Sequence, residues 1–493
     1  MRKIYVLVIF ELLLTNFLFA KELRWAADAE GNAPYIFQDP ENPKVLKGFE
    51  VEIADALGKE LGWEPKFVQN QWDGLVPGLA RNDYDVVING LEITNDRKQE
   101  VLFSIPYYYT FEQLVVRSDD HEINSLSDLY GKRVGCLKNS LAERILIAQG
   151  GFDISSYEGE VNAFEDLKNG RLDATLVDYP IALYYASWNR ELRLSGDPVG
   201  EVVYGAAMRL EDTLLLSDIN RALINITRNG VLREILEKWN LWNEVMAIRL
   251  GESAAYQFNP YEFTNYMKFA SNDVNFITTI ERYISFMPLF LRGALITLSL
   301  SILSMILAII VGLMLALMRV FGTKFISRIA VWIIEIIRGT PLLIQLFLIY
   351  YALPTFGIKI SPFIAGIVGL GINYAAYEAE NYRAGLFAVA KGQIEAALSL
   401  GMNRKQAIKS IVLPQSLKIT LPPMTNDFIS LLKDSSLVSV IAMVELAKVY
   451  NQIATTYFDW LGTGLIVSAI YLLLGLPFVK LAKYFEWKFG KIN

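Results

Sequence analysis

Hydrophobic positions are spread unevenly along this 493-residue chain, and the spacing of the polar residues between them changes twice. The first twenty residues begin with Arg2 and Lys3 and continue as an almost wholly apolar run, which is typical of a secretory signal. Glu11 interrupts that run, and residues 18–20 match a small-x-small cleavage site poorly. Residues 1–20 are therefore interpreted as a signal peptide or an uncleaved anchor.

Residues 21–247 alternate short strand-like runs with amphipathic helical stretches. Residues 84–88 are typical of a strand, whereas residues 51–61 have the apolar spacing of a helix. Strands that alternate with helices predict parallel sheets of α/β type. A stretch of this length can bury the cores of two lobes, and we expect the chain to cross between them near residues 115 and 203.

The remainder of the chain is dominated by long apolar runs. A polar, aromatic connector over residues 248–285 is interpreted as a linker that includes an interfacial helix, and residues 286–493 as an all-α transmembrane domain. The first run carries no charge and is long enough to cross a hydrocarbon layer of roughly 30 Å. About five membrane-spanning helices are predicted, at residues 293–318, 329–353, 361–386, 424–446 and 460–479.

Basic residues are concentrated in alternate loops between these runs. The first loop, the third loop and the tail are rich in Lys and Arg, and the other two loops are nearly free of them. The positive-inside rule then places the C-terminus in the cytoplasm and the α/β domain outside a multi-pass plasma or inner membrane. The residues concerned are Arg319, Lys324, Arg328, Lys391, Arg404, Lys405, Lys409, Lys480, Lys483, Lys488 and Lys491.

Composition excludes several functional classes. The chain is 53% hydrophobic and 20% charged, with net charge -6, and this acidic balance argues against nucleic-acid binding. The single cysteine, Cys136, and the single histidine, His121, leave no disulfide framework or Cys/His metal site, and no cofactor is predicted. No Gly-x-x-x-x-Gly-Lys-Ser/Thr phosphate loop occurs, so ATP hydrolysis requires a separate subunit.

Residues 391–416, in the third loop, predict a helical hairpin. Gly401 suits the left-handed position that follows a helix, and Asn403 with Gln406 predicts a capping box for the next one. The segment Glu395-Ala396-Ala397, four residues before Gly401, resembles the EAA loop of ABC-importer permeases. That resemblance implies docking of the hairpin into a groove on a cytoplasmic ABC ATPase.

Other segments strengthen this resemblance, which covers about residues 285 to 490. They look like the polar amino-acid branch of the permease family and include residues 338–345, 382–385 and 432–440. The family implies a type I importer permease that works in the lipid membrane as a homodimer or with a permease paralogue.

The outer domain resembles the family 3 extracellular solute-binding proteins over residues 22–245. Its landmarks are residues 48–54, 72–77 and 170–174. The family implies a bilobed, periplasmic-binding-protein-like fold of type II that binds a polar amino acid between its lobes.

Two charged residues match the main ligand contacts of this family. Arg97, in the first turn of a helix that Thr94 can cap, matches the arginine that grips the ligand carboxylate, with a surface ion pair as the alternative. Asp178 follows the strand at residues 174–177, at the end of a parallel strand where α/β sheets place ligands. It matches the acid that pairs with the α-ammonium.

Four further positions match family ligand contacts. Trp72 matches an aromatic residue that stacks on the ligand, and the backbone carbonyl of Gly90 is expected to accept from the ammonium. Tyr35 is a candidate with core packing as the alternative. Ser140 faces the carboxylate in the family, and with Glu143 three residues later it also predicts a helix cap.

The sequence departs from the family at two cleft positions. Glu92 replaces Ser or Thr, and Asn32 replaces an aromatic residue. The Glu92 carboxylate could contact the ammonium, reach a cationic side chain of the ligand, or turn outward into solvent. Asp28 and Glu30 add negative charge, so neutral polar or cationic amino acids are favoured over acidic ones.

Glu380 and Arg383 lie within the third predicted span, where burying a charged side chain in lipid costs free energy. They either face the translocation path or pair with neighbouring helices. The sequence as a whole predicts the substrate-binding and permease subunit of an amino-acid importer, not an enzyme. A receptor or channel with the same bilobed domain is the alternative, although it leaves the hairpin unexplained. An enzyme such as a dehydratase needs an acid or base in the cleft, where Glu92 is the unusual candidate.

Overall fold

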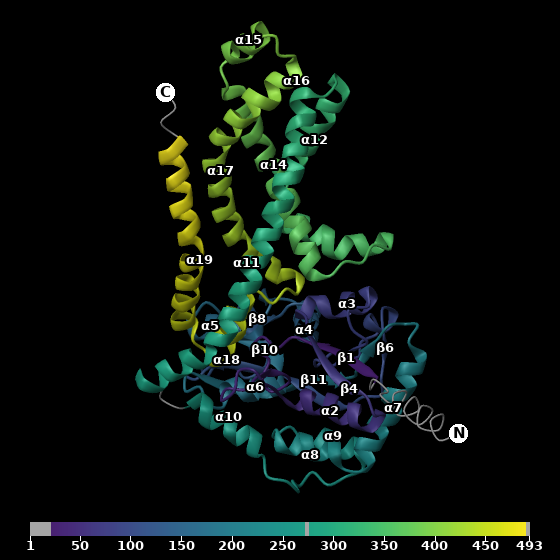
Figure 1. Cartoon of the computed structure of the whole chain (residues 1–493). Coiled ribbons are helices and arrows are strands. Elements are labelled where there is room, and N and C mark those ends of the chain that lie inside the picture. The colour runs from purple at the N-terminus through teal and green to yellow at the C-terminus, as the bar shows by residue number, and fades with distance from the viewer. Residues whose placement is uncertain (1–20, 272–275, 490–493) are drawn as a thin grey trace, which may run out of the picture. The chain divides into compact units, whose positions relative to one another are not determined.

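The computed structural model describes residues 21–271 and 276–489, which divide into two compact units (Figure 1). The first unit extends to Ile280 and includes Thr455–Phe458, and the second contains Glu281–Ala454 and the chain from Asp459 onward. The predicted signal or anchor at residues 1–20 lies outside the described residues.

The first lobe of the first unit is built on a five-stranded sheet with the order β4-β1-β5-β12-β6. The central strand β1 pairs in parallel with β4 and β5, and β12 is antiparallel to β5 and β6. The strands are β1 (Glu22–Ala27), β4 (Glu64–Gln69), β5 (Val86–Val87), β6 (Leu102–Phe103) and β12 (Ala207–Met208). The helices are α2 (Phe49–Leu61), α3 (Leu75–Arg81), α7 (Thr213–Arg228) and α8 (Val231–Lys238), and β2 (Phe37–Gln38) pairs with β3 (Leu46–Lys47).

The second lobe contains the sheet β11-β7-β10-β8-β9, in which β10, β8 and β9 are parallel and β7 is antiparallel to both of its neighbours. Its strands are β7 (Tyr108–Arg117), β8 (Arg133–Leu137), β9 (Asp153–Tyr157), β10 (Ala174–Asp178) and β11 (Leu192–Tyr204). Helices α4 (Leu141–Gln149), α5 (Glu160–Lys168) and α6 (Tyr179–Ala186) follow β8, β9 and β10, and α9 (Glu244–Leu250) and α10 (Tyr261–Ser271) come later in the chain. This alternation matches the predicted bilobed α/β fold.

The chain passes between the lobes from β6 to β7 and from β11 to β12. The second passage lies close to residue 203, as predicted. The first prediction, near residue 115, is wrong because Val115 pairs with Thr175 inside the second sheet. The passage lies earlier, between Phe103 and Tyr108. A β-branched run predicts a strand, but the run itself does not show which sheet the strand joins.

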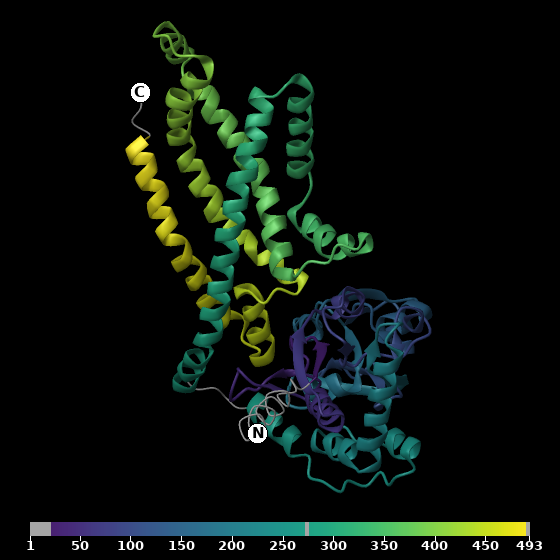
Figure 2. The same ribbon diagram turned by 45° about the vertical axis from the view of Figure 1, so that its right-hand side comes forward.

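The second unit is helical, and its long helices pack side by side, α12 and α17 against α14, and α19 against α17 (Figures 1 and 2). Its main helices are α11 (Phe276–Phe321), α12 (Lys324–Gly339), α14 (Pro362–Ala388), α17 (Leu413–Asp434) and α19 (Trp460–Phe489). Shorter elements are α13 (Leu342–Phe347), the turns η4 (Leu348–Ala352), η5 (Leu353–Phe356) and η7 (Ser435–Ile441), and α18 (Leu446–Tyr457).

Two of these helices, over Thr279–Phe321 and Trp460–Lys488, are long and apolar enough to cross a membrane, counted over the described residues. A third span is possible if Lys324–Gly339 and Leu342–Phe356 act together, although they are bent by 104°. The predicted span at 329–353 is therefore interrupted by a bend after Gly339. Pro341 explains the break, because proline disfavours a helical conformation at the residue before it.

The fourth predicted span is displaced. The helix α17 begins at Leu413 and ends at Asp434, so the predicted range 424–446 covers only its second half. Polar residues such as Lys418 near the start of α17 hide the helix from a hydropathy reading.

The predicted hairpin between α14 and α17 is present. It consists of α15 (Lys391–Ser399), α16 (Arg404–Ala407) and the turn η6 (Ile408–Val412). Gly401 has φ 83°, and Asn403 and Gln406 form the capping box, so both local predictions are confirmed. Figures 1 and 2 show this hairpin at the end of the bundle where α11 connects to α12.

Candidate functional site

The cleft between the two lobes encloses a cavity of about 570 Å³, counting the part that opens to solvent. Its walls come from the carboxyl ends of β1, β4, β5, β8, β9 and β10, or from the turns that follow them. Open α/β sheets place ligands at this edge. Of the eight predicted ligand contacts, Arg97 alone does not line the cavity.

The lining is strongly acidic. Six acidic side chains and no Lys, Arg or His line it within residues 21–271 and 276–489. The six are Asp28, Glu30, Glu92, Glu158, Glu160 and Asp178. Such a cavity attracts a cation and repels an anion, most strongly where water is excluded.

Asp178 ends β10 and is partly exposed, whereas its hydrogen-bond partners are buried. Its Oδ2 accepts hydrogen bonds from the hydroxyls of Tyr35, at 3.2 Å, and of Tyr204. The cross-strand neighbour of Asp178 is Glu112, whose fully buried carboxylate oxygens accept no hydrogen bond from an N–H donor among the described residues. Like charges directly opposite each other destabilise a sheet, so a positive ligand group beside this pair is favoured.

This crowding shifts the pKa values of the acidic groups upward. Burial, followed by the charge of Glu92, raises the pKa of Asp178 to about 6. Burial, followed by the charges of Asp178, Asp28 and Glu92, raises the pKa of Glu160 to about 8. Burial and Asp178 raise the pKa of Glu112 well above its usual value. The groups that act on Asp178 or are affected by its charge are Glu50, Glu92, Glu112, Glu160, Tyr35, Tyr107 and Tyr204.

These shifts predict that cation binding strengthens as the pH rises from about 5 to about 8. A bound cation favours the charged carboxylate and lowers its pKa, so protons leave Asp178 and Glu160 on binding when the pH lies near or below their ligand-free values of about 6 and about 8. Acid opposes that release and weakens binding. Calorimetry of the full chain, in buffers of different ionisation enthalpy, measures both the affinity and the released protons. A flat affinity without proton release contradicts the assignment.

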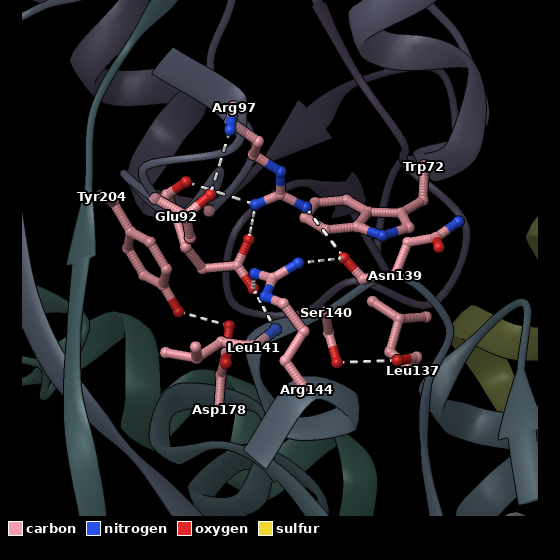
Figure 3. Close-up of polar contacts among 12 residues, drawn as sticks. Trp72, Glu92, Arg97, Leu137, Asn139, Ser140, Leu141, Arg144, Asp178 and Tyr204 are labelled. Atoms are coloured by element: carbon pink, nitrogen blue, oxygen red, sulfur yellow. Dashed lines mark hydrogen bonds and ion pairs between the residues drawn. The ribbon is translucent and has the colours of Figure 1, made fainter. Parts of the chain in front are cut away.

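Glu92 and Arg97 contact each other directly (Figure 3). The Glu92 carboxylate accepts from Arg97 Nη1 and, at 2.7 Å, from the backbone N–H of Leu141 at the start of α4. Glu92 is 2% exposed, so the alternative in which it turns outward into solvent is wrong. Arg97 Nη2 donates to the backbone carbonyl of Asn139 at 3.0 Å, and the Arg97 backbone N–H donates to Thr94 Oγ1, as the predicted cap requires.

The other predicted contacts lie in the cavity wall. The Trp72 indole Nε1 donates to the Lys138 carbonyl at 3.1 Å, and its ring centre lies 5.4 Å from the Arg97 guanidinium carbon. Ser140 accepts from the backbone N–H of Glu143, which confirms the predicted cap. Asn32 donates to the Asp28 carbonyl at 3.1 Å.

Tyr35 and Gly90 combine two functions. Tyr35 is both buried in the core and part of the cavity wall, so packing and site placement hold together. Gly90 has φ 57° and donates its backbone N–H to the buried Glu50 carboxylate at 2.6 Å. The hydrogen bond to Glu50 therefore holds the left-handed backbone turn at Gly90, a conformation that favours glycine.

Several cavity residues were not predicted. Glu158 and Glu160 precede or begin α5, and Asn89 precedes Gly90. Acidic residues at a helix start are usually explained by the helix dipole, so no sequence pattern placed Glu158 and Glu160 in a site. Tyr204 and Glu112 reach Asp178 through pairing between distant strands, for which no local sequence signal exists.

Glu380 and Arg383 in α14 pair with neighbours. Glu380 contacts Arg319 of α11, and Arg383 Nε lies 2.9 Å from Glu380 Oε2. Of the two predicted alternatives, facing the translocation path or pairing with neighbours, the structure contains the ion pairs.

Comparison with known proteins matches each unit to a protein family. Residues 23–241 match the bacterial extracellular solute-binding proteins, family 3, and residues 308–491 match the binding-protein-dependent transport system inner membrane component. The chain is 37% identical over 191 residues to the glutamine transport system permease protein GlnP of Escherichia coli K12, covering 38% of this chain and 87% of that protein.

A second permease and one solved structure are also similar. The L-cystine transport system permease protein TcyB of Bacillus subtilis is 37% identical over 175 residues, with 36% of this chain and 75% of that protein covered. The structure of an ancestral arginine-binding protein bound to glutamine is 34% identical, with 45% and 98% covered and a TM-score of 0.42.

Proposed function

Because this chain belongs to the amino-acid ABC transporter permease family and carries a family 3 solute-binding domain, we propose that it captures its own substrate and passes it through its own helices. It is an inner membrane protein and a subunit of an amino-acid importer. The proposed substrates are cationic or neutral polar amino acids, with acidic ones excluded.

The acidic cavity is the observation that carries the substrate class. A ligand ammonium placed near Asp178 compensates a carboxylate that accepts hydrogen bonds from the hydroxyls of Tyr35 and Tyr204. Trp72 and Tyr35 offer apolar surface to the rest of the ligand, and the Gly90 carbonyl lies in the same wall. An acidic side chain on the ligand finds no Lys, Arg or His among the described lining residues.

The orientation of the helical unit in the membrane is proposed from the positive-inside rule, by which loops rich in Lys and Arg face the cytoplasm. The α11–α12 connection, the hairpin and the last turns of α19 lie at one end of the bundle in both views (Figures 1 and 2). These segments carry the basic residues, so this end is assigned to the cytoplasm and the binding domain to the opposite side. Apolar side chains exposed along the helices, such as Leu295 and Leu465, suit contact with lipid.

The hairpin is the proposed contact for a separate ABC ATPase. Glu395 and Ala396 are exposed, whereas Ala397 is buried. Leu398 and Leu400 are 44% and 82% exposed, which leaves apolar surface at the tip. Exposed apolar side chains that lie close together are typical of a docking surface. A second permease subunit, identical or paralogous, completes the proposed path.

Transport by reconstituted vesicles tests the proposed function. Vesicles that contain the full chain and its ATPase are expected to accumulate cationic or neutral polar amino acids when ATP is supplied. Glutamate and aspartate are expected to be excluded, since the cavity repels their second carboxylate. Vesicles without ATP are the control. Uptake of glutamate that matches or exceeds uptake of every cationic or neutral polar amino acid contradicts the substrate class.

A further inference from the structure

Glu92 fills a complete anion-binding position inside the cleft (Figure 3). The position consists of the Arg97 guanidinium from the first lobe and the backbone N–H of Leu141 from the second. It lies at the N-terminus of the nine-residue helix α4, where the helix dipole favours negative charge. Arg144 Nη2, from the same helix, lies 3.9 Å from the second carboxylate oxygen of Glu92.

Both terminal nitrogens of the Arg97 guanidinium already have partners within the protein. Its Nη1 binds Glu92, and its Nη2 donates to the Asn139 carbonyl. The Arg97 side chain is 13% exposed and does not line the cavity. A ligand carboxylate can therefore reach this guanidinium only after Glu92 has left.

Displacement of Glu92 is unfavourable because of its surroundings. The other lining carboxylates, which include Asp28, Glu160 and Asp178, surround the space into which Glu92 could move. A displaced Glu92 loses its contact with Arg97 while its negative charge stays in that acidic space. The alternative is that Glu92 stays, and the ligand carboxylate itself enters an acidic cavity whose described lining contains no Lys, Arg or His.

We propose that Glu92 supplies in cis the carboxylate that an amino-acid ligand otherwise brings, so that the cleft prefers amine and guanidinium cations without a free carboxylate over their parent amino acids. The inference rests on the proposed function in one respect, that this cleft is the ligand site. In this arrangement Asp178 accepts the ligand cation, and the Arg97–Glu92 pair closes the first lobe onto α4 without help from the ligand.

Matched ligand pairs that differ by one carboxylate test this preference. The pairs are arginine and agmatine, lysine and cadaverine, and ornithine and putrescine. Calorimetry uses the purified full chain in lipid nanodiscs, as wild type and as Glu92→Ser. Wild type is expected to bind the amine about tenfold more tightly than the parent amino acid, a change of one decade in Kd.

The Glu92→Ser variant is expected to reverse that order, because the emptied position between Arg97 and α4 becomes available to a ligand carboxylate. The ratio of the two Kd values is expected to change by about a hundredfold. Glu100→Ser is the matched control, since Glu100 is exposed and lies outside the cavity. It removes the same charge and is expected to keep the wild-type ratio.

If Glu92→Ser does not fold, Glu92→Gln removes the charge while keeping the side-chain length, and it is expected to shift the ratio in the same direction. A wild-type preference for the parent amino acids, or a ratio that both variants leave unchanged, overturns the inference, while the proposed amino-acid function stands. Failure of wild type to bind any member of the three pairs overturns the inference and the proposed cationic class together.

Discussion

The Asp178→Asn variant is expected to lose nearly all binding of a cationic ligand without losing its fold. Removing one partner of a buried charged contact costs roughly 2 to 5 kcal/mol, which is a loss of affinity of about thirtyfold to several thousandfold. Asparagine keeps an oxygen that can accept from Tyr35 and Tyr204. It also removes the repulsion with Glu112, so the ligand-free protein is expected to be at least as stable as wild type. Calorimetry with the full chain and thermal unfolding measure the two effects.

Asp173→Asn is the control for this change. Asp173 lies in the same lobe, pairs with Arg133 at 2.8 Å and does not line the cavity. The variant therefore removes one carboxylate from the domain without touching the site, and its affinity is expected to equal that of wild type. Wild-type affinity in Asp178→Asn, or an equal loss in both variants, contradicts the assignment of the ligand cation to Asp178.

Much of the fold follows from periodicity, because strands and helices leave their own spacing in the sequence. Periodicity does not show which sheet a strand joins. The crossing between lobes was predicted near Val115, which instead pairs within the second sheet. The same limit applies to the membrane unit. Hydropathy identifies apolar runs, but the bend after Gly339 depends on a proline, and the first half of α17 is too polar to resemble a span.

Site residues could be predicted where the role of the residue follows from its place in a single strand, helix or turn. Asp178 at the end of a strand, Ser140 as a cap and Trp72 in the cleft wall are of this kind. The Glu92–Arg97 contact lies within five residues, yet the sequence left three orientations open for Glu92. The choice among them depends on Leu141, which the second lobe brings to the carboxylate.

The Gly401→Val variant is expected to bind ligand normally and to lose ATP-driven uptake. Gly401 has φ 83°, in the left-handed region that β-branched residues rarely adopt. Forcing valine into that region costs of order 1 to 3 kcal/mol, so the connection between α15 and α16 is expected to rearrange. A rearranged hairpin presents Leu398 and Leu400 in the wrong place for the ATPase. Uptake by vesicles and ligand binding by the same preparation are the two measurements.

Gly392→Val separates backbone strain from the added side chain. Gly392 lies in α15 of the same hairpin, and a Cβ atom meets no other atom within 4 Å at either glycine. Only Gly401 has a left-handed φ, so a loss of uptake confined to Gly401→Val is attributed to the turn and not to bulk. Full uptake by Gly401→Val contradicts coupling through the hairpin. Equal loss in both variants instead assigns the effect to the valine side chains on the docking surface.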